Sequence, residues 1–225
     1  MNWLGRLTVP LFHAILSVSK QHTMFPAKLL EVLQYLNSIA IAVSESHEDG
    51  RVNSIDDEDT IIDLLIEKYG EENIIKPPPR CWWDVKIFGY YFNIKSSKYG
   101  SAADNFSSKA AILYALTDLP EDKLNVSSWK KFQDALKNHS GENNRDYYIL
   151  SLNKTNNEVH LTSLKSLSKL TANGNNLPFQ IKWKDNTNPV QRTYSEAYDF
   201  LVGCYKDSVR KKISVLWFRK TEHLF

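Results

Sequence analysis

Residues 82–96 alternate between hydrophobic and polar positions, and this pattern predicts a β-hairpin. Two alternating runs, 82–88 and 90–96, meet at Phe88-Gly89, which fits a two-residue turn. With that turn, Asp84 pairs with Asn93, and the two side chains share one face of the hairpin. Lys95 follows Asn93 by two positions and therefore lies on the same face. A three-residue turn would shift the register by one and weaken the pairing of Asp84 with Asn93.

Apolar residues at helical spacing predict helices on both sides of the hairpin. The helices are expected over residues 26–46, 56–70, 105–120, 126–139 and 194–216, with a further helical segment before residue 26 and a loop over 47–54. Acidic residues in the first turn of the 56–70 helix, and Gly70 after its last turn, mark the expected ends of that helix. Ser127 or Ser128 is the expected cap of the fourth helix, and a Thr193–Glu196 capping box begins the last one.

The remaining strands complete a mixed α+β pattern. A strand, a turn at Asn156-Asn157 and a second strand are expected over 146–164, and a short strand is expected around 179–183. The predicted fold class is α+β, sandwich-like in the α/β/α sense, with a central mixed β-sheet flanked by helices. We expect a single domain over residues 1–225, with an N-terminal helical part (about 1–50) and a C-terminal basic helix (about 194–216).

Composition excludes several classes of protein. Hydrophobic residues make up 42% and charged residues 24% of the chain, which is typical of globular proteins and argues against disorder. No run of apolar residues is long enough to span a membrane, and the N-terminus is not expected to be a signal peptide. Cys81 and Cys204 form neither a disulfide framework nor a metal-ligand spacing, which favours free thiols in the cytosol.

Charge is unevenly distributed although the net charge is only +2. Residues 56–67 contain six acidic and no basic side chains, whereas residues 182–220 contain nine basic and four acidic ones. This distribution suits a protein that holds a cation in one place and a polyanion in another. Two solvated helix faces are the simpler interpretation of the same pattern.

The polar face of the hairpin has a possible catalytic use. A carboxylate and an amide oxygen can bind Mg²⁺, which takes one or two protein oxygens and keeps several waters. The metal polarises a phosphodiester, and a nearby lysine stabilises the charge that develops on phosphorus or orients the attacking water. A cross-strand pair of Asp84 and Lys95 on an exposed hairpin is the structural alternative.

Asp84 followed by Asn93-Ile94-Lys95 resembles the PD-(D/E)xK signature of metal-dependent nucleases, best known from type II restriction endonucleases. The segment 93–119, NIKSSKYGSAADNFSSKAAILYALTDL, is similar to the part of those enzymes in which the motif leads into a helix. The segment 171–183, TANGNNLPFQIKW, also resembles sequences of the same group of enzymes. The resemblance implies that Asp84 and Asn93 are catalytic Mg²⁺ ligands and that Lys95 assists the water. It also implies a glutamate from the preceding helix, for which Glu58 is the choice and Asp59 and Asp56 are the alternates.

This sequence departs from the signature at two positions. Asn93 stands where an acid is usual, and Trp83 replaces the proline. An amide oxygen can still bind Mg²⁺ but adds no charge, so Glu58 would contribute more of the negative charge. The proline matters less because only the acid is a ligand.

The resemblance implies a type II restriction endonuclease that hydrolyses both strands of a specific double-stranded DNA sequence. Such an enzyme uses Mg²⁺ and no organic cofactor, acts as a homodimer on a palindromic site, and works in the cytoplasm of a prokaryotic cell without contacting a membrane. Two other functions remain open at this point. One is a structure-specific or repair nuclease, or a resolvase, of the same fold; the other is a non-catalytic DNA-binding protein on that scaffold.

Candidate DNA contacts lie outside the hairpin. The candidates for phosphate contact are basic: Lys98, Lys109, Arg210, Lys211 and Lys212. Asn175, Asn176 and Gln180 are the candidates for base contact, because Asn and Gln can bind adenine through two hydrogen bonds in the major groove. Asp104 and Asn105 are placed near the scissile phosphate, or alternatively at the cap of the following helix.

Overall fold

A computed structural model describes residues 24–43, 50–100 and 103–221, with only the backbone described for 50–55 and 214–221. The chain divides into two compact units, residues 1–40 and 41–225, and each is described by itself. The first unit contains helix α2, Ala27–Ser38, whose buried side chains include Leu29 and Leu36. The expected helix is therefore shorter than predicted: Ile39 is extended, as β-branched residues favour. The helical segment expected before residue 26 lies outside the described residues.

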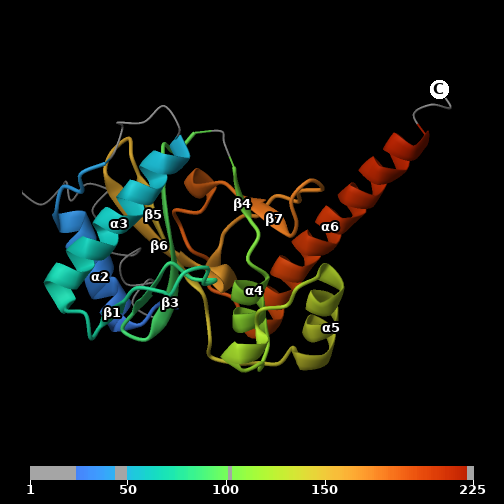
Figure 1. Ribbon diagram of the computed structural model, residues 1–225, viewed down its shortest axis with the longest axis horizontal. Coiled ribbons are helices and arrows are strands. Elements are labelled where there is room, and N and C mark those ends of the chain that lie inside the picture. The colour runs from blue at the N-terminus through green and yellow to red at the C-terminus, as the bar shows by residue number, and fades with distance from the viewer. Residues whose placement is uncertain (1–23, 44–49, 101–102, 222–225) are drawn as a thin grey trace, which may run out of the picture. The chain divides into compact units, whose positions relative to one another are not determined.

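The second unit is built on a five-stranded mixed sheet with strand order β1-β2-β3-β5-β6 (Figure 1). The strands are β1 (Ile74–Ile75), β2 (Val85–Ile87), β3 (Tyr90–Ser97), β5 (Tyr148–Asn153) and β6 (Glu158–Ser163). β3 and β5 are parallel, and all other neighbours are antiparallel. The predicted central mixed sheet is thus present, and so is the predicted strand–turn–strand unit, whose turn residue Asn157 has a positive φ.

The hairpin register is the one that the two-residue turn predicts. Val85 pairs with Phe92, Lys86 with Tyr91 and Ile87 with Tyr90. Phe88 and Gly89 both have positive φ, 48° and 85°, as a type I′ turn requires. Gly89 takes this conformation without strain because it has no Cβ.

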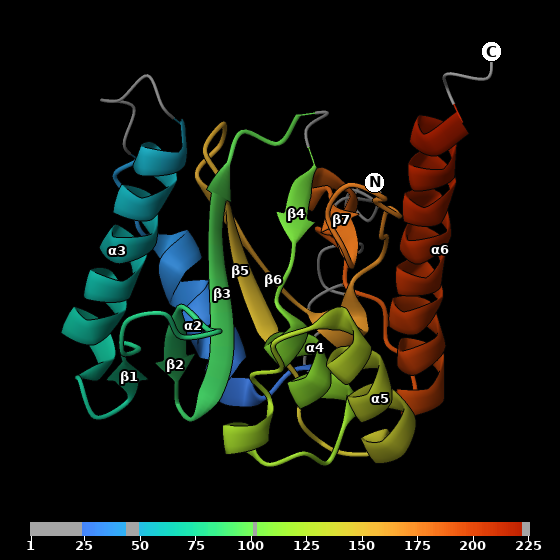
Figure 2. The ribbon, with the colours of Figure 1, turned by 45° about the vertical axis from the view of Figure 1, so that its right-hand side comes forward.

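Helices cover both faces of the sheet (Figure 2). On one side lies α3, Gly50–Tyr69, with Ile61 and Leu65 fully buried. On the other side, residues of the sheet share a hydrophobic cluster with α4 (Lys109–Leu116), α5 (Trp129–His139) and α6 (Tyr194–Thr221). Three short 3₁₀ helices connect these elements: Glu121–Lys123, Leu164–Ser166 and Trp183–Asp185.

Several predicted helix boundaries are confirmed. Gly70, with φ 83°, follows α3, and Ser128 caps α5 by accepting a hydrogen bond from the Lys131 N–H. At the start of α6, the Thr193 N–H donates to Glu196 Oε2 (2.8 Å) and the Glu196 N–H donates to Thr193 Oγ1 (3.3 Å), which is the predicted capping box.

Other predicted boundaries are wrong, among them the end of the 105–120 helix, since α4 ends at Leu116. α3 begins at Gly50, inside the expected 47–54 loop, so the acidic cluster lies within the helix instead of in its first turn. Residues 105 and 106, expected to be helical, belong instead to strand β4 (Asp104–Phe106), which pairs with β7 (Phe179–Ile181) in a separate two-stranded sheet. The cap of α4 is consequently Ser108, which accepts from the Ala111 N–H, and not Asp104 or Asn105. Pairing with a strand distant in sequence overrides the helical pattern there.

Candidate active site

The hairpin brings Asp84 and Asn93 into direct contact. The Asn93 Nδ2 group donates to Asp84 Oδ2 at 2.7 Å, and the Ile94 backbone N–H donates to the same oxygen at 2.8 Å. The Asp84 N–H in turn donates at 2.8 Å to the carbonyl of Phe92, which is the register partner of Val85; Asp84 itself precedes β2 and has no ladder partner in β3. The aspartate is therefore held in one orientation by its own hairpin.

Lys95 lies between two carboxylates. Its Nζ is 3.1 Å from Glu58 Oε1 and 4.0 Å from Asp84 Oδ2. Glu58 comes from α3, and it can reach Lys95 because β2 pairs only with residues 90–92 of β3. Figure 2 shows α3 beside the part of β3 that continues past β2. All three side chains are 20–30% exposed, so the group is partly buried yet open to a ligand.

Burial shapes the electrostatics of this group. Burial raises the pKa of Asp84, and the Lys95 charge and the Ile94 N–H partly oppose that rise. Burial, and then the nearby Asp84 carboxylate, also raise the pKa of Tyr147 well above its usual value. A cation placed beside Asp84 would favour its ionised form.

A pocket of about 410 Å³ adjoins the group and is lined by both Glu58 and Asp84. Asp59 of α3, the three prolines 77–79 and Trp83 form other parts of its wall. Lys76 and Arg80 also line it and bring positive charge to its rim. The pocket thus joins acidic and basic side chains in one concave surface.

The oxygen atoms present fit Mg²⁺. Asn93 Oδ1 is buried and has no hydrogen-bond partner among the described residues, so an amide oxygen is left without a partner beside Asp84. Buried polar atoms are normally paired, and a metal ion or ordered water is one explanation of an exception. In the described part of the chain no three His, Cys, Asp or Glu residues cluster as a metal site, which leaves a set of two carboxylates and one amide. Mg²⁺ accepts so few protein ligands because it keeps waters.

A buried ion pair behind the site was not expected from the sequence. Asp57, which is fully buried, accepts from Ser96 Oγ at 2.6 Å and lies 2.6 Å from Lys154 Nζ. Asp57 precedes Glu58 on α3, and Ser96 follows Lys95 on β3. The contact therefore fixes the position of α3 against β3 at the point where Glu58 meets Lys95. The acidic cluster was the only sequence signal for Asp57, and Lys154 had none.

The alternates for the glutamate lie farther from the lysine contact. Asp59 lines the pocket, whereas Asp56 is exposed and does not line it. Glu58 is the acid of this cluster that contacts Lys95 directly.

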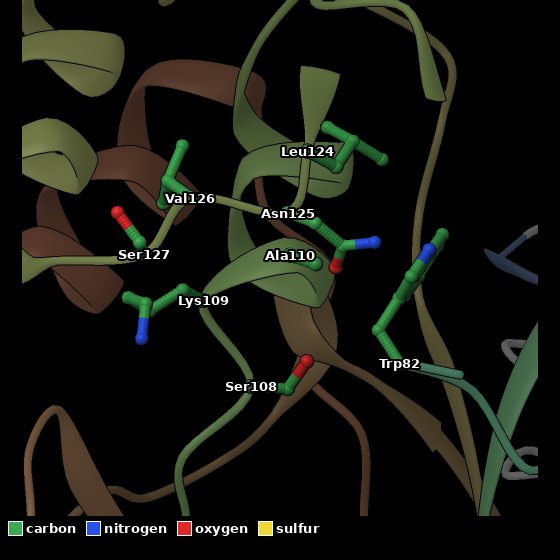
Figure 3. A pocket seen from close by; sticks show the side chains of 8 residues that line it. All are labelled: Trp82, Ser108, Lys109, Ala110, Leu124, Asn125, Val126 and Ser127. Carbon is green, nitrogen blue, oxygen red and sulfur yellow. The ribbon is translucent and has the colours of Figure 1, made fainter. Parts of the chain in front are cut away.

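The candidate phosphate-binding residues are spread over several elements. Lys109 lines a second pocket, of about 260 Å³, at the start of α4; Ser108, Asn125 and Trp82 also line this pocket (Figure 3). Its ammonium lies 4.9 Å from the centre of the Trp129 ring. Arg210 is paired with Asp207 at 2.7 Å, and Lys211 donates to the Ala172 carbonyl at 3.1 Å. Lys98 and Lys212 lie outside both pockets, as do Arg210 and Lys211.

Two of the candidate DNA contacts lie together, one expected near the scissile phosphate and one expected to contact a base. Asn105 of β4 pairs directly with Gln180 of β7, and Gln180 Nε2 donates to Asn105 Oδ1 at 3.0 Å. Asp104 accepts a hydrogen bond from the Trp183 indole, which gives this side chain a structural contact. Asn175 and Asn176 are exposed in the loop before β7.

Comparisons with known proteins give a weak likeness to a solved structure. No protein-family model matches the chain, and no curated protein matches it. The chain is similar to a solved restriction endonuclease in complex with substrate DNA, at 19% identity and a TM-score of 0.26, over 63% of this chain and 57% of that one. At this TM-score the likeness carries no argument about function. No helix within the described residues is long and apolar enough to cross a membrane.

Proposed function

We propose that this protein is a Mg²⁺-dependent endonuclease that hydrolyses both strands of a specific double-stranded DNA sequence, as type II restriction enzymes do. The observation that carries the proposal is the contact group around Lys95. Its Nζ lies 3.1 Å from Glu58 and 4.0 Å from Asp84, while Asn93 holds Asp84 at 2.7 Å. A structural cross-strand pair would need only Asp84 and Lys95; it would not call for a second acid from α3 or an unpartnered amide oxygen.

Each side chain has a role that follows from its position. Asp84, Glu58 and Asn93 Oδ1 supply the oxygen atoms that would hold Mg²⁺, and the ion would supply a Lewis acid for the phosphodiester. Asn93 Nδ2 and the Ile94 N–H orient the Asp84 carboxylate. Lys95 presents its ammonium between the two acids, where it stabilises negative charge developing on the phosphate or orients the attacking water.

The amide at position 93 shifts the charge balance of the site. Asn93 contributes an oxygen but no negative charge, so Asp84 and Glu58 supply both of the formal charges. The two carboxylate charges balance the charge of one divalent ion, and the ammonium of Lys95 remains to interact with the phosphate.

The biological setting is part of the same proposal. Cleavage of both strands of a palindrome is achieved by a homodimer whose two-fold axis matches that of the DNA. The enzyme would then work in the cytoplasm of a prokaryotic cell, with DNA as its partner and no organic cofactor.

One cleavage experiment separates this proposal from its alternatives. The purified protein is incubated with a long linear DNA of known sequence in Mg²⁺, and the products are sequenced at their ends. Discrete fragments with a common end sequence are expected. Nicks confined to mismatches or junctions would indicate a repair nuclease or resolvase instead. A bandshift with intact DNA would indicate a non-catalytic binding protein and contradict the proposal.

A further inference from the structure

Three side-chain amides meet on the small β4–β7 sheet. Asn105 Oδ1 accepts from Asn173 Nδ2 at 2.9 Å and from Gln180 Nε2 at 3.0 Å. Asn105 is exposed, Gln180 is half-buried and Asn173 is 8% exposed. Asn105 is thus held by the buried amide of Asn173, and Gln180 is bonded to Asn105 in turn.

A backbone group fixes the orientation of all three amides. The Asn175 N–H donates to Asn173 Oδ1 at 3.0 Å, and a backbone N–H can only be a donor. Asn173 must therefore direct its Nδ2 toward Asn105, and the Asn105 atom that receives it must be the oxygen. The Gln180 atom that meets the same oxygen must then be the nitrogen. This chain of constraints removes the usual ambiguity between amide oxygen and nitrogen.

The buried amide is anchored to α6. The Asn173 N–H donates to Ser208 Oγ at 2.9 Å, and the Ser208 hydroxyl donates to the Cys204 carbonyl at 3.0 Å. The next residue, Gly174, lies so close to α6 that a Cβ there would be 2.9 Å from the Lys211 carbonyl carbon. Backbone hydrogen bonds in both directions between Thr171 and Gln180 hold the other end of the loop.

Each outer amide keeps one terminal group without a partner among the described residues, an NH2 donor on Asn105 and an oxygen acceptor on Gln180. With their inward atoms bonded, Asn105 retains Nδ2 and Gln180 retains Oε1, and neither atom has a hydrogen-bond partner in the part of the chain that the structure describes. A neighbouring donor and acceptor match the major-groove edge of adenine, which offers N7 as acceptor and N6 as donor. Guanine offers two acceptors, N7 and O6, and would face Gln180 Oε1 with a second acceptor.

We propose that Asn105 and Gln180 together recognise an adenine in the major groove, with Asn105 Nδ2 donating to N7 and Gln180 Oε1 accepting from N6. This inference rests on the proposed function as a sequence-specific DNA enzyme and names the base-reading pair of that enzyme. It replaces the earlier assignment of Asn105 to the neighbourhood of the scissile phosphate. Asn175 and Asn176 are not needed for this contact.

Selection from random DNA tests the pair without requiring cleavage. Wild-type protein, Gln180→Ala and Asn105→Ala are each used to select from a library of random-sequence duplexes in Ca²⁺, and the bound duplexes are sequenced. Gln191→Ala serves as the matched control, because Gln191 is an exposed glutamine in the loop before α6. Circular dichroism of each variant verifies folding.

The wild-type protein and Gln191→Ala are expected to enrich A·T at one defined position of a common motif. Gln180→Ala and Asn105→Ala are expected to lose about tenfold or more of the preference at that position only, as for a bidentate base contact. A follow-up duplex with 7-deazaadenine at the position should lose binding to a similar degree.

Two results would overturn the inference while leaving the proposed function standing. In the first, both variants retain the wild-type motif; in the second, the position that they affect is G·C. A wild-type protein that enriches no motif but still cleaves DNA in Mg²⁺ also overturns it. Failure of the proposed function is recognised separately, as absence of Mg²⁺-dependent cleavage in the wild type.

Discussion

Asn93→Asp replaces the amide of the candidate site with the acid that is usual in the signature, and its effect should depend on metal. The substitution exchanges Nδ2, a donor 2.7 Å from Asp84 Oδ2, for a second negatively charged oxygen. Two unit charges at 2.7 Å repel by about 6 kcal/mol at an effective dielectric constant of about 20, and by about 4 kcal/mol after relaxation to roughly 4 Å. Because rotation of the side chains relieves part of this repulsion, we expect the free energy of unfolding to fall by about 2–4 kcal/mol at pH 8 in EDTA.

The loss should be reversible in two ways. A divalent cation between the two carboxylates removes the repulsion, so Ca²⁺ should restore most of the lost stability and should stabilise Asn93→Asp more than the wild type. Acid should also restore it. Repulsion raises the pKa of the carboxyl pair in the folded state above its unfolded value, so the penalty is present above the folded pKa and disappears as the pH falls through it.

The assay is urea denaturation followed by circular dichroism, at pH 8 and pH 5, with EDTA or with Ca²⁺. Asn156→Asp is the matched control, since Asn156 Nδ2 donates to Glu158 Oε2 at 3.0 Å in an exposed turn. There the added charge should cost less than about 1 kcal/mol, with no response to Ca²⁺. Equal destabilisation of Asn93→Asp with and without Ca²⁺ would refute the assignment of this pair as a metal site.

Three further predictions concern the framework of the site. Lys154→Met removes the cation from the fully buried Asp57 and should lower the free energy of unfolding by about 3–5 kcal/mol in urea denaturation; a loss below about 1 kcal/mol would contradict the role given to this ion pair. Gly174→Ala places a Cβ against the α6 backbone and should destabilise the protein by about 1–3 kcal/mol, whereas Gly203→Ala, with open space around it inside α6, should not; equal effects would contradict the close approach of loop and helix. The pKa of Asp84, raised by burial, should make Ca²⁺ binding decline at a higher pH than for an ordinary aspartate as the solution is acidified. Lys95→Met removes a charge that lowers this pKa and should move the decline to still higher pH. Calorimetric titration with Ca²⁺ at a series of pH values measures where binding declines. A decline that stays at the same pH in Lys95→Met, or moves to lower pH, would contradict the prediction.

The hairpin is the part of the site that the sequence predicts best. Its register depends on the local turn at Phe88-Gly89 and on alternation within one short segment, so Asp84, Asn93 and Lys95 could be brought together from the sequence. The choice of Glu58 depended on the family resemblance, and its contact with Lys95 crosses from a helix to a strand.

Features made by distant segments were not predictable in the same way. Residues 105 and 106 of β4 were assigned to the following helix, because their strand partner β7 lies far along the chain and the pairing leaves no local pattern. The Asp57–Lys154 pair likewise joins α3 to the residue after β5. The amide group on the β4–β7 sheet depends on Asn173 being buried against α6, which the Asn-Gly turn pattern alone does not reveal.

The central claim is that Asp84, Asn93, Glu58 and Lys95 form a metal-dependent site that cleaves DNA. The most direct measurement compares Mg²⁺-dependent cleavage of a long linear DNA by the wild type, by Lys95→Ala and by Lys137→Ala, an exposed lysine on α5. We expect the wild type and Lys137→Ala to produce the same fragments, and Lys95→Ala to lose cleavage by a factor of about 10² or more while remaining folded. Cleavage by folded Lys95→Ala at the wild-type rate would contradict the account.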